Sequence, residues 1–378
     1  MTVALSPLRA PRACAGGVAV DPGFWHDRRV FLTGHTGFKG AWLALWLKTL
    51  GARVSGFSSG VPTRPSLYEL ARVGEGMESI EGDVRDFPVL LRALEQAQPE
   101  VVVHMAAQAL VRRSYAAPRE TYEVNVMGTV NLLDAVRRQG SGVRAVVVVT
   151  SDKCYENREW EWAYREHEPM GGHDPYSNSK GCAELVTAAY RRSFFARADG
   201  PRVASARAGN VIGGGDWSED RLVADLMRGA LAGEAVHIRN PSAVRPWQHV
   251  LNPLSGYLAL AQALWASPQH ARGWNFGPGE EDALAVGALV ERLSALWPGG
   301  LELVPQASSA AGSGPHEAHY LKLDSSLARG RLGWRPTWGL QEGLRETVRW
   351  YRGLSEDEDM QALSVAQIEG FQRALVPA

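Results

Sequence analysis

The stretch RVFLTGHTGFKGAWLALWLKTLG, residues 29–51, reads as one strand, one turn and one helix. Residues 29–33 are mainly β-branched or apolar, which is typical of a strand that is covered on both faces. The apolar stretch 39–51 has the length of a helix, and Gly51 stands where a helix commonly ends. We therefore predict that the glycine-rich segment TGHTGFKG turns the chain sharply from a buried strand into a helix.

The same alternation continues to residue 208, because short β-branched runs are followed repeatedly by longer amphipathic stretches. The predicted elements after the first unit are a strand at 53–57, a helix at 87–97, a strand at 100–106, a helix at 119–139, a strand at 144–150, a helix at 175–195 and a strand at 202–208. This order predicts an α/β fold with a doubly wound parallel sheet, whose ligands bind at the carboxyl ends of the strands.

This pattern divides the chain into three predicted parts. Residues 1–22 contain proline and glycine and are predicted to be a loose extension. Residues 23–208 form the domain with the parallel sheet, and residues 209–378 form mainly a smaller C-terminal α/β lobe that binds substrate. We leave open a return of the chain to the first domain.

The bulk composition favours a small-molecule partner. The 378 residues include 40 basic and 41 acidic side chains, for a net charge of −1, and no block of like charge stands out. This balance argues against a nucleic-acid groove or an anionic membrane surface. Three unevenly spaced cysteines indicate neither a disulfide framework nor a metal site, and they favour a reducing cytoplasm. No apolar run approaches the length of a membrane span or a signal peptide.

Gly34, Gly37 and Gly40 have the spacing G-x-x-G-x-x-G between the first strand and the first helix. Glycine is needed at such positions because the chain turns tightly, a pyrophosphate approaches the backbone closely, and the helix packs against the strand. An ordinary tight turn would give the same pattern without a ligand. The alternating fold that follows favours a dinucleotide-binding site.

The end of the second strand lacks the acidic residue that commonly binds the adenine ribose, and Phe57, Ser58 and Ser59 stand there instead. We assign the ribose contact to Ser58 and predict NAD as the cofactor. Arg64 raises NADP as an alternative, although its position after Pro62 favours a solvated loop arginine. Asp83 follows a predicted third strand and is placed to reach the adenine amino group, an exposed turn aspartate being the alternative.

Tyr176 and Lys180 lie one helical turn apart on the same face of the predicted helix 175–195. A phenol has a pKa near ~10, so at neutral pH it is a poor base unless a cation stabilises its ionised form. Lys180 is placed to supply that charge. Such pairs are usually surface pairs, but this one begins the helix that follows the strand ending before Ser151, and that context favours catalysis.

The segment TSDKCYENREW, residues 150–160, places a hydroxyl, a carboxylate and an ammonium at the end of a buried strand. Asp152 and Lys153 can be interpreted as a helix cap followed by a solvated lysine. They can also be an acid and a base beside a bound ligand, since the carboxyl ends of parallel strands form the binding edge of such a sheet.

The motifs TGHTGFKG, HMAAQ, TSDKCYEN and YSNSK occur in the order found in the extended short-chain dehydrogenase/reductase superfamily, which this chain resembles. The resemblance implies a Rossmann-type sheet and a catalytic Ser, Tyr and Lys beside a nicotinamide. Longer strings resemble the bacterial CDP-glucose 4,6-dehydratases from about Phe24 to about Trp338. These strings are FLTGHTGFKGAWL, SDKCYENREW, RAGNVIGGGDW, RPWQHVLNPLSGYL, NFGP and HYLKLDSS.

The resemblance implies an NAD-dependent lyase that serves deoxysugar synthesis, such as that of O-antigen lipopolysaccharide. Such an enzyme oxidises CDP-glucose at carbon 4, eliminates water across carbons 5 and 6, and returns the hydride to carbon 6. By this resemblance Tyr176, assisted by Ser151 and Lys180, removes the proton of the 4-hydroxyl, Asp152 is the acid at carbon 6, and Lys153 is the base at carbon 5. A nucleotide-sugar 4-epimerase, a dehydratase for another nucleotide sugar and a non-catalytic dinucleotide sensor are the alternatives.

The turn and the resemblance together give a predicted set of ligand contacts. The cofactor contacts are Gly34, His35, Gly37, Phe38, Lys39, Gly40, Ser58, Asp83, Val84, Ala106, Ala107, Gln108, Asn125, Tyr176 and Lys180. The substrate contacts are Asn210, Arg239, Arg245 and His249. Arginine suits a diphosphate because its planar fork pairs with phosphate oxygens, although each arginine could equally be a surface side chain.

Members of the superfamily commonly dimerise through two long helices, here 119–138 and 176–195. Val124, Leu132, Leu185 and Ala189 are apolar positions that permit such packing, and they equally permit burial in the chain's own core. We expect a homodimer, with a tetramer as the alternative.

Overall fold

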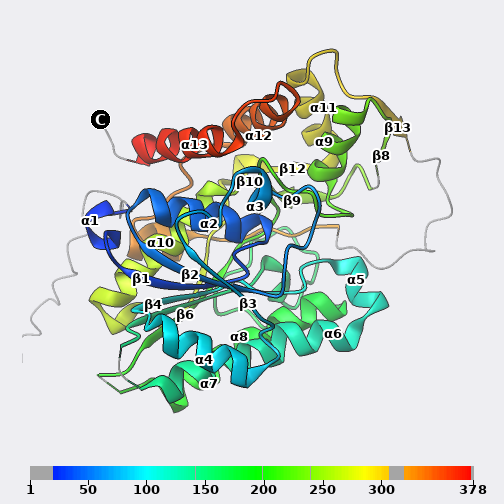
Figure 1. The fold of residues 1–378 in the computed structure, drawn as a ribbon. Helices are drawn as coiled ribbons and strands as arrows, with labels where there is room; N and C mark the ends of the chain where they lie inside the picture. The colour runs from blue at the N-terminus through cyan, green and yellow to red at the C-terminus, as the bar shows by residue number, and fades with distance from the viewer. Residues whose placement is uncertain (1–19, 141, 198, 239, 306–318, 376–378) are drawn as a thin grey trace, which may run out of the picture.

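A seven-stranded parallel sheet lies at the centre of the protein (Figure 1). The structure is a computed structural model that describes residues 20–375 except 141, 198, 239 and 306–318. The strands run in the order β11-β6-β5-β4-β1-β2-β3, and every neighbouring pair is parallel. They are β1 (Arg29–Thr33), β2 (Arg53–Ser58), β3 (Glu78–Glu81), β4 (Val101–His104), β5 (Ala145–Val149), β6 (Arg202–Arg207) and β11 (Gly273–Asn275). The predicted doubly wound parallel sheet is confirmed.

The central strands β4 and β5 are almost continuously apolar because both faces of the sheet are covered there. Successive residues of β5 point to opposite faces, so that Val147 packs into one core and Val146 into the other. Figure 1 shows α4, α7 and α8 on one face of the sheet and α2 on the other. The covering helices are α4 (Phe87–Ala97), α7 (Gly128–Gln139) and α8 (Pro175–Ser193) on one side, and α2 (Phe38–Thr49) and α10 (Leu251–Ala266) on the other.

The helix predicted at 119–139 consists of three consecutive segments. They are α6 (Pro118–Tyr122), a π-helical turn η1 (Glu123–Met127) and α7. Asn125 lies in the π turn and makes two bonds to the loop after β4: its Oδ1 accepts from the Gln108 backbone N–H at 2.9 Å, and its Nδ2 donates to the Gln108 carbonyl at 3.0 Å. The wider turn therefore serves to hold that loop.

The segment after residue 208 forms short strand pairs and additional helices beside the sheet. Its strands are β7 (Val211–Ile212), β8 (Val236–Ile238), β9 (Val244–Pro246), β10 (Gln248–His249), β12 (Ala283–Ala285) and β13 (Leu303–Pro305). Its further helices are α9 (Leu222–Ala232), η3 (Pro268–His270), η4 (Glu280–Asp282), α11 (Val286–Leu296) and η5 (Ala328–Leu332). Two elements of this segment belong to the central layers, because β11 pairs with β6 and α10 packs on the sheet.

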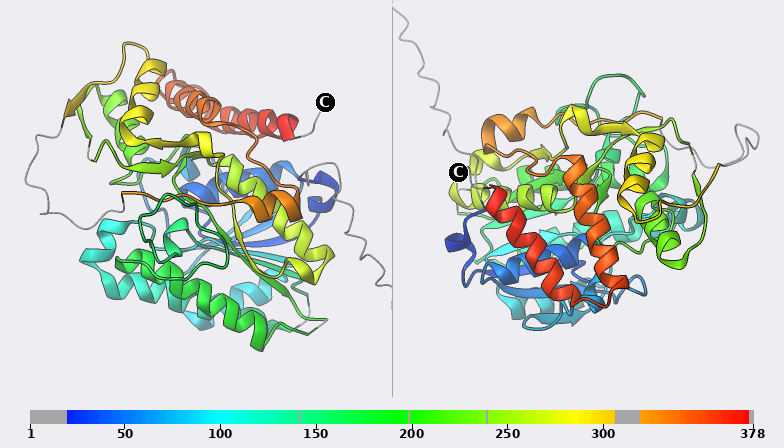
Figure 2. Two further views of the ribbon diagram at one scale, coloured as in Figure 1. Left: turned by 180° about the vertical axis from the view of Figure 1, so that it is seen from behind. Right: turned by 90° about the horizontal axis from the view of Figure 1, so that it is seen from above.

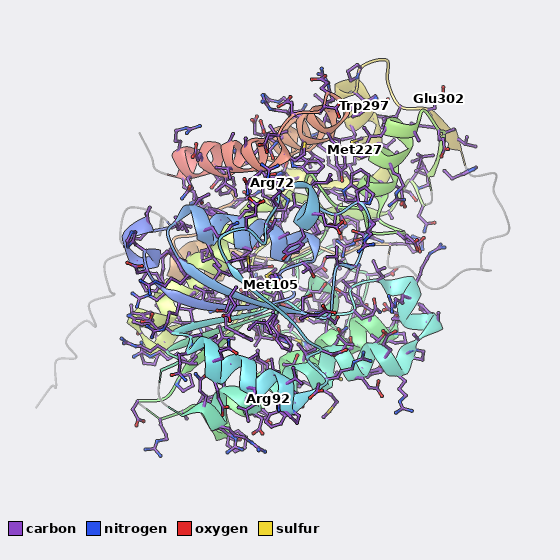
Figure 3. All side chains as sticks on the ribbon, in the orientation of Figure 1. Arg72, Arg92, Met105, Met227, Trp297 and Glu302 are labelled. Atoms are coloured by element: carbon purple, nitrogen blue, oxygen red, sulfur yellow. The ribbon has the colours of Figure 1, made fainter. Side chains whose placement is uncertain are left out.

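Two C-terminal helices, α12 (Leu340–Ser355) and α13 (Met360–Leu375), lie side by side above α2 (Figures 1 and 2). Phe371 packs edge-on against Trp46 of α2, with ring centroids 5.5 Å apart. Arg72, labelled in Figure 3, donates to Asp359 at the start of α13 at 2.8 Å. The chain end thus covers the outer face of α2. None of the helices in the described part of the chain is long and apolar enough to cross a membrane.

The first described residue is Val20, which is buried. Trp25, at the end of α1 (Pro22–Trp25), is fully buried and donates from Nε1 to Gln262 of α10 at 2.8 Å. The extension predicted for residues 1–22 otherwise falls on 1–19, outside the described residues. The remaining short helices, near the carboxyl ends of the strands, are α3 (Leu67–Leu70), α5 (Val111–Ala116) and η2 (Asp152–Cys154).

Candidate active site

A cleft of about 1530 Å³ opens at the carboxyl ends of the central strands. It is lined by the turn after β1, the loops after β2, β3 and β4, the start of α8, and the segment that follows β6. Met105, which lines it, lies near the centre of the molecule in Figure 3. Doubly wound sheets bind ligands at this position, so the cleft is the candidate active site.

The glycine turn forms one wall of the cleft. Gly34 has a φ of 76°, and a Cβ added there would lie 2.7 Å from the backbone nitrogen of Ala106. A Cβ on Gly40 would collide with the Gly34 carbonyl. Gly37 caps α2 without a side chain, which leaves the first amides of the helix open to a phosphate. Side chains at positions 34 and 40 would collide with the surrounding backbone, so only glycine allows this tight turn, and the turn fits the pyrophosphate of a dinucleotide.

Several other predicted cofactor contacts line the same cleft: Phe38, Lys39, Ser58, Asp83, Val84, Ala106, Ala107 and Gln108. The Ser58 hydroxyl lies 2.7 Å from that of Thr36, so hydroxyl groups stand where a carboxylate would otherwise bind the ribose. Asp83 is held by Arg85 at 2.6 Å, and the hydrogen bond from Arg85 lowers the pKa of that carboxyl. Arg64 has an 82% exposed side chain that pairs with Glu69 at 3.6 Å.

His35 and Asn125 do not line the cleft, although both were predicted to contact the cofactor. The His35 ring packs behind the turn against Gly56, and its Nε2 lies 2.7 Å from the Ser79 hydroxyl. Burial lowers the pKa of His35 to about 4, so the ring is neutral at neutral pH. Both residues support loops of the site from behind, because their side chains point into the core.

Lys39 contributes an amine to the site in addition to that of Lys180. Its Nζ donates to the hydroxyl of the fully buried Tyr257 at 3.0 Å. Burial, followed by the charges of Arg221 and Lys180, lowers the pKa of Lys39 to about 7. The site therefore gathers several cations, which suits an anionic ligand such as a dinucleotide or a nucleotide sugar.

Tyr176 and Lys180 are both buried on α8 and both line the cleft. Asp174 caps this helix by accepting from the Ser177 N–H at 2.9 Å, which fixes its first turn. Burial raises the pKa of Tyr176 to about 12, against the opposing effects of a hydrogen bond with Ser151 and the charge of Arg221. Burial also lowers the pKa of Lys180 to about 8. Burial, rather than the neighbouring lysine, therefore dominates the pKa of the phenol.

The segment after β5 presents Ser151, Asp152 and Lys153 on the short helix η2. Ser151 caps this helix: its Oγ accepts from the Lys153 N–H at 3.3 Å and donates to Asp152 Oδ1 at 2.9 Å. Asp152 is 1% exposed, and its Oδ2 has no hydrogen-bond partner within the described residues. Buried polar atoms are nearly always paired, so this oxygen is a polar group that the described protein does not itself satisfy.

The opposite wall of the cleft contains two of the four predicted substrate contacts. Asn210 lines it in a left-handed conformation with a φ of 36°. Arg245 also lines it and donates to the carbonyls of Val244 and His319 at 2.9 and 3.3 Å. Arg239 lies outside the described residues.

His249 does not reach the cleft, which corrects its assignment to the substrate. It is fully buried on β10 between the rings of Trp42 and Trp338, whose centroids lie 6.3 and 5.0 Å away. Burial lowers the pKa of His249 to about 3, which leaves a neutral ring in the core. The motif VRPWQHV places the histidine beside the site along the chain, but the strand directs its side chain inward.

Arg221 is a cleft residue that the sequence analysis missed. Its Nη1 lies 3.3 Å from Asp216 Oδ2, both residues line the cleft, and the charge of Arg221 lowers the pKa of Tyr176. Arg221 appears in the sequence only as the start of a helix. The signal that could have identified it is the acid in GGGDW, which is followed five residues later by an arginine.

The chain matches the model of the NAD dependent epimerase/dehydratase family over residues 30–275. It is 52% identical over 360 residues to a CDP-glucose 4,6-dehydratase from Salmonella typhimurium, which covers 94% of this chain and 99% of that protein. It is also 30% identical to a dTDP-glucose 4,6-dehydratase from Streptomyces antibioticus, over 72% of this chain and 76% of that protein.

Solved structures of related enzymes share the fold. A dTDP-glucose 4,6-dehydratase from Streptomyces venezuelae with NAD bound has a TM-score of 0.71 and 26% identity, covering 89% of this chain and 99% of that chain. A UDP-glucose 4-epimerase from Thermus thermophilus with NAD has a TM-score of 0.72 and 27% identity, covering 86% and 99%. The chain belongs to the NAD dependent epimerase/dehydratase family and, within it, to the group of the CDP-glucose 4,6-dehydratases.

Proposed function

We propose that this protein is a lyase that converts CDP-glucose to CDP-4-keto-6-deoxyglucose with NAD as its cofactor. The observation that carries the proposal is the placement of Asp152 and Lys153 in one cleft with Tyr176 and Lys180. The identity of 52% to a CDP-glucose 4,6-dehydratase supports the choice of cytidine and glucose.

The residues present fit NAD. The tight glycine turn suits a pyrophosphate and the hydroxyls at the end of β2 suit a ribose. Lys180 lines the same cleft and is proposed to hold the nicotinamide ribose. Bound NAD would accept a hydride from carbon 4 of the sugar and return it to carbon 6. The relatives whose structures contain NAD support this cofactor.

Three side chains of the cleft each carry out one proton transfer. Tyr176 takes the proton of the 4-hydroxyl while Ser151 hydrogen-bonds the same oxygen. Lys153 then takes the carbon-5 proton, which the new ketone makes acidic, and the electron pair of that C–H bond forms the C5–C6 double bond as the C6–O bond breaks. Asp152 gives a proton to the departing 6-hydroxyl, which leaves as water.

Asp152 lines the same cleft as Tyr176, and this supports its assignment as the acid. Asn210, Arg245 and Arg221 line the opposite wall and are proposed to hold the diphosphate and sugar. An arginine pairs well with phosphate oxygens because its donors are fixed in a plane.

Incubation of the purified protein and NAD with CDP-, dTDP-, GDP- and UDP-glucose tests the proposal. We expect the ultraviolet absorbance of a 4-keto sugar in alkali with CDP-glucose and far less with the other three. Equal turnover of a second nucleotide sugar would contradict the cytidine assignment. Absence of a 4-keto product from all four would contradict the dehydratase.

A nucleotide-sugar 4-epimerase is the second candidate, because the family model and the Thermus thermophilus structure include such enzymes. An epimerase shares Tyr176 and Lys180 but has no elimination step, so it has no use for a base at carbon 5. The substitution Lys153→Ala therefore separates the two functions.

Lys153→Ala is expected to lower dehydration of CDP-glucose by about 10²-fold, because a positioned base commonly contributes that much. The variant should still oxidise carbon 4, so reduced nicotinamide should accumulate on the enzyme after substrate is added. Absorbance of the reduced cofactor and chromatography of the sugar product measure both effects. The matched control is Lys322→Ala, a lysine outside the large cleft, which should leave turnover unchanged. Unaltered turnover of Lys153→Ala with formation of CDP-galactose would favour the epimerase.

We also propose a homodimer in the cytoplasm, with a tetramer as the alternative. Leu185 and Met127, which are 59% and 49% exposed, and the exposed Ala189 lie along α8 and η1 and support pairing of these helices with a second copy. Leu132 is buried in the chain's own core and takes no part, and Val124 is half-buried. Light scattering of the purified protein measures the assembly.

A small-molecule substrate, rather than nucleic acid, fits the balanced charge of the chain.

A further inference from the structure

A buried ion pair joins Glu184 and Arg207 beneath the cleft. Arg207 Nη2 donates to Glu184 Oε2 at 2.7 Å, and the two side chains are only 5% and 4% exposed. Glu184 lies on α8 one turn after Lys180, and Arg207 ends β6. Neither residue lines the cleft, so neither can contact the substrate or the cofactor directly.

Glu184 holds the first end of the segment that contains the proposed acid and base. Thr150, which directly precedes Ser151, donates from Oγ1 to Glu184 Oε1 at 2.5 Å. Ser205 of β6 donates to Oε2 at 2.6 Å. Burial acts to raise the pKa of Glu184, but the charge of Arg207 and the three hydrogen bonds outweigh it, so the pKa lies below its usual value. The carboxylate is therefore charged, and its hydrogen bonds are of the stronger, charge-assisted kind.

Arg207 holds the other end of the same segment. Its Nη1 donates to the hydroxyl of Tyr155, the residue after η2, at 2.6 Å and to the carbonyl of Glu166 at 3.1 Å. The Tyr155 hydroxyl in turn donates to Asn275 of β11 at 2.7 Å. Residues 151–154 are thus held on both sides by the two members of one ion pair.

We propose that the Glu184–Arg207 pair is a positioning device that fixes Asp152 and Lys153 relative to Tyr176 and Lys180. The inference rests on the proposed function and adds to it two residues that never touch substrate. Glu184 lies on the same helix as Tyr176 and Lys180, the residues that serve the oxidation. Its bond to Thr150 therefore sets the distance between these residues and the elimination residues Asp152 and Lys153 on η2.

Chemistry explains why such a device is needed. Oxidation at carbon 4 uses Tyr176 and Lys180 from one helix and needs only Ser151 from the segment 151–154, whereas elimination also needs Asp152 and Lys153 to meet carbons 6 and 5 of the same sugar. A misplacement of about 1 Å in a reacting geometry can lower a rate by about 10²-fold. A buried ion pair is by itself weak evidence for stability, so stability does not explain why this pair is present. Its bonds to both ends of the catalytic segment do. Loosening it should therefore slow elimination more than oxidation.

Two matched variants test this role while leaving the ion pair in place. Thr150→Val and Ser205→Ala each remove one hydroxyl that donates to Glu184, but only Thr150 adjoins the catalytic segment. We expect Thr150→Val to lower the rate of dehydration by about tenfold, a small share of the loss that misplacement can cause, and Ser205→Ala to change it by less than about twofold. Tyr155→Phe, which removes the acceptor for Arg207 at the other end, should act like Thr150→Val.

The informative measurement follows the two half-reactions separately in stopped flow. Reduction of bound NAD reports oxidation at carbon 4, and exchange of the carbon-5 hydrogen with deuterated water reports the elimination base. In Thr150→Val the second rate should fall further than the first, which depends on the segment only through Ser151, so that reduced nicotinamide accumulates. Thermal unfolding of all three variants separates this effect from loss of fold.

Equal losses in Thr150→Val and Ser205→Ala, or equal slowing of both half-reactions in Thr150→Val, would overturn the positioning role while leaving the proposed function intact. Failure of the wild-type protein to form a 4-keto product would instead overturn the proposed function. The wild-type assay and the comparison of variants therefore separate the two failures.

Discussion

Replacement of Tyr176 by phenylalanine is expected to lower kcat for CDP-glucose by about 10³- to 10⁴-fold, because the variant has no group to take the proton of the 4-hydroxyl. The ring of phenylalanine fills nearly the same volume, and the hydroxyl that is lost contacts Ser151 in the cleft. The protein should therefore fold and bind NAD as the wild type does. Turnover by product absorbance and NAD affinity by fluorescence measure the two effects.

The pH dependence of the wild-type reaction provides a second test of Tyr176 as the base. Burial raises the pKa of Tyr176 to about 12, so at neutral pH the free enzyme holds the phenol almost entirely protonated. The active fraction, the phenolate, rises with pH as long as the pH is below that pKa. Because kcat/KM reports groups of the free enzyme, it should increase with pH across the neutral and mildly alkaline range.

Two results would contradict the assignment of Tyr176. One is a Tyr176→Phe variant that keeps kcat within about tenfold of the wild type, and the other is a variant that keeps the wild-type rise of kcat/KM with pH. Tyr190→Phe is the matched control, since Tyr190 is half-buried on the same helix but lies outside the cleft. That control should alter neither the rate nor its pH dependence.

The sheet could be predicted from the sequence because its strands carry a local signal. β5 is apolar at every position and β4 at every position but its last, His104, which identifies strands with both faces covered, and Gly51 marks the end of a helix. The π turn around Asn125 was missed, because one added residue in a helical turn leaves an amphipathic pattern nearly unchanged. Its consequence appears only when the loop it holds, at Gln108, is in place.

The site was predictable where chemistry and strand ends coincide. Ser151, Asp152 and Lys153 follow β5, and Tyr176 begins the next helix, so topology alone brings them to one edge of the sheet. His249 shows the limit of this reasoning, because a motif gives the position of a residue along the chain and not the side to which it points. The roles of Glu184 and Gly209 depend on contacts with residues 34 and 57 positions away along the chain.

Gly209 lies where the chain leaves β6 and faces the proposed acid. A Cβ built on this glycine would overlap the Oδ2 and Cγ atoms of Asp152 and would lie 2.9 Å from its Oδ1. The backbone of Gly209 is not in the left-handed region, so alanine can adopt its conformation. Its role is therefore to leave room for the carboxylate, whose Oδ2 is the oxygen without a hydrogen-bond partner in the described part of the chain.

Gly209→Ala should consequently lower kcat by about 10³-fold, because the added methyl group pushes the Asp152 carboxylate away from the departing hydroxyl. The fold should tolerate the change, since the short side chain of Asp152 can rotate, and thermal unfolding checks this point. Gly330→Ala is the control: among the described residues, nothing beyond its own helical turn lies within 4 Å of a Cβ there, so its turnover should equal that of the wild type.

A double-mutant cycle decides whether the loss passes through the carboxylate. In an Asp152→Ala background the methyl group of Gly209→Ala has no carboxylate to displace, so the second substitution should lower kcat by less than about threefold further. Residues that act through one group are non-additive, whereas independent effects multiply. A full loss on top of Asp152→Ala would mean that Gly209 shapes the sugar site by itself, and Asp152 would then lose its place as the acid that the glycine accommodates.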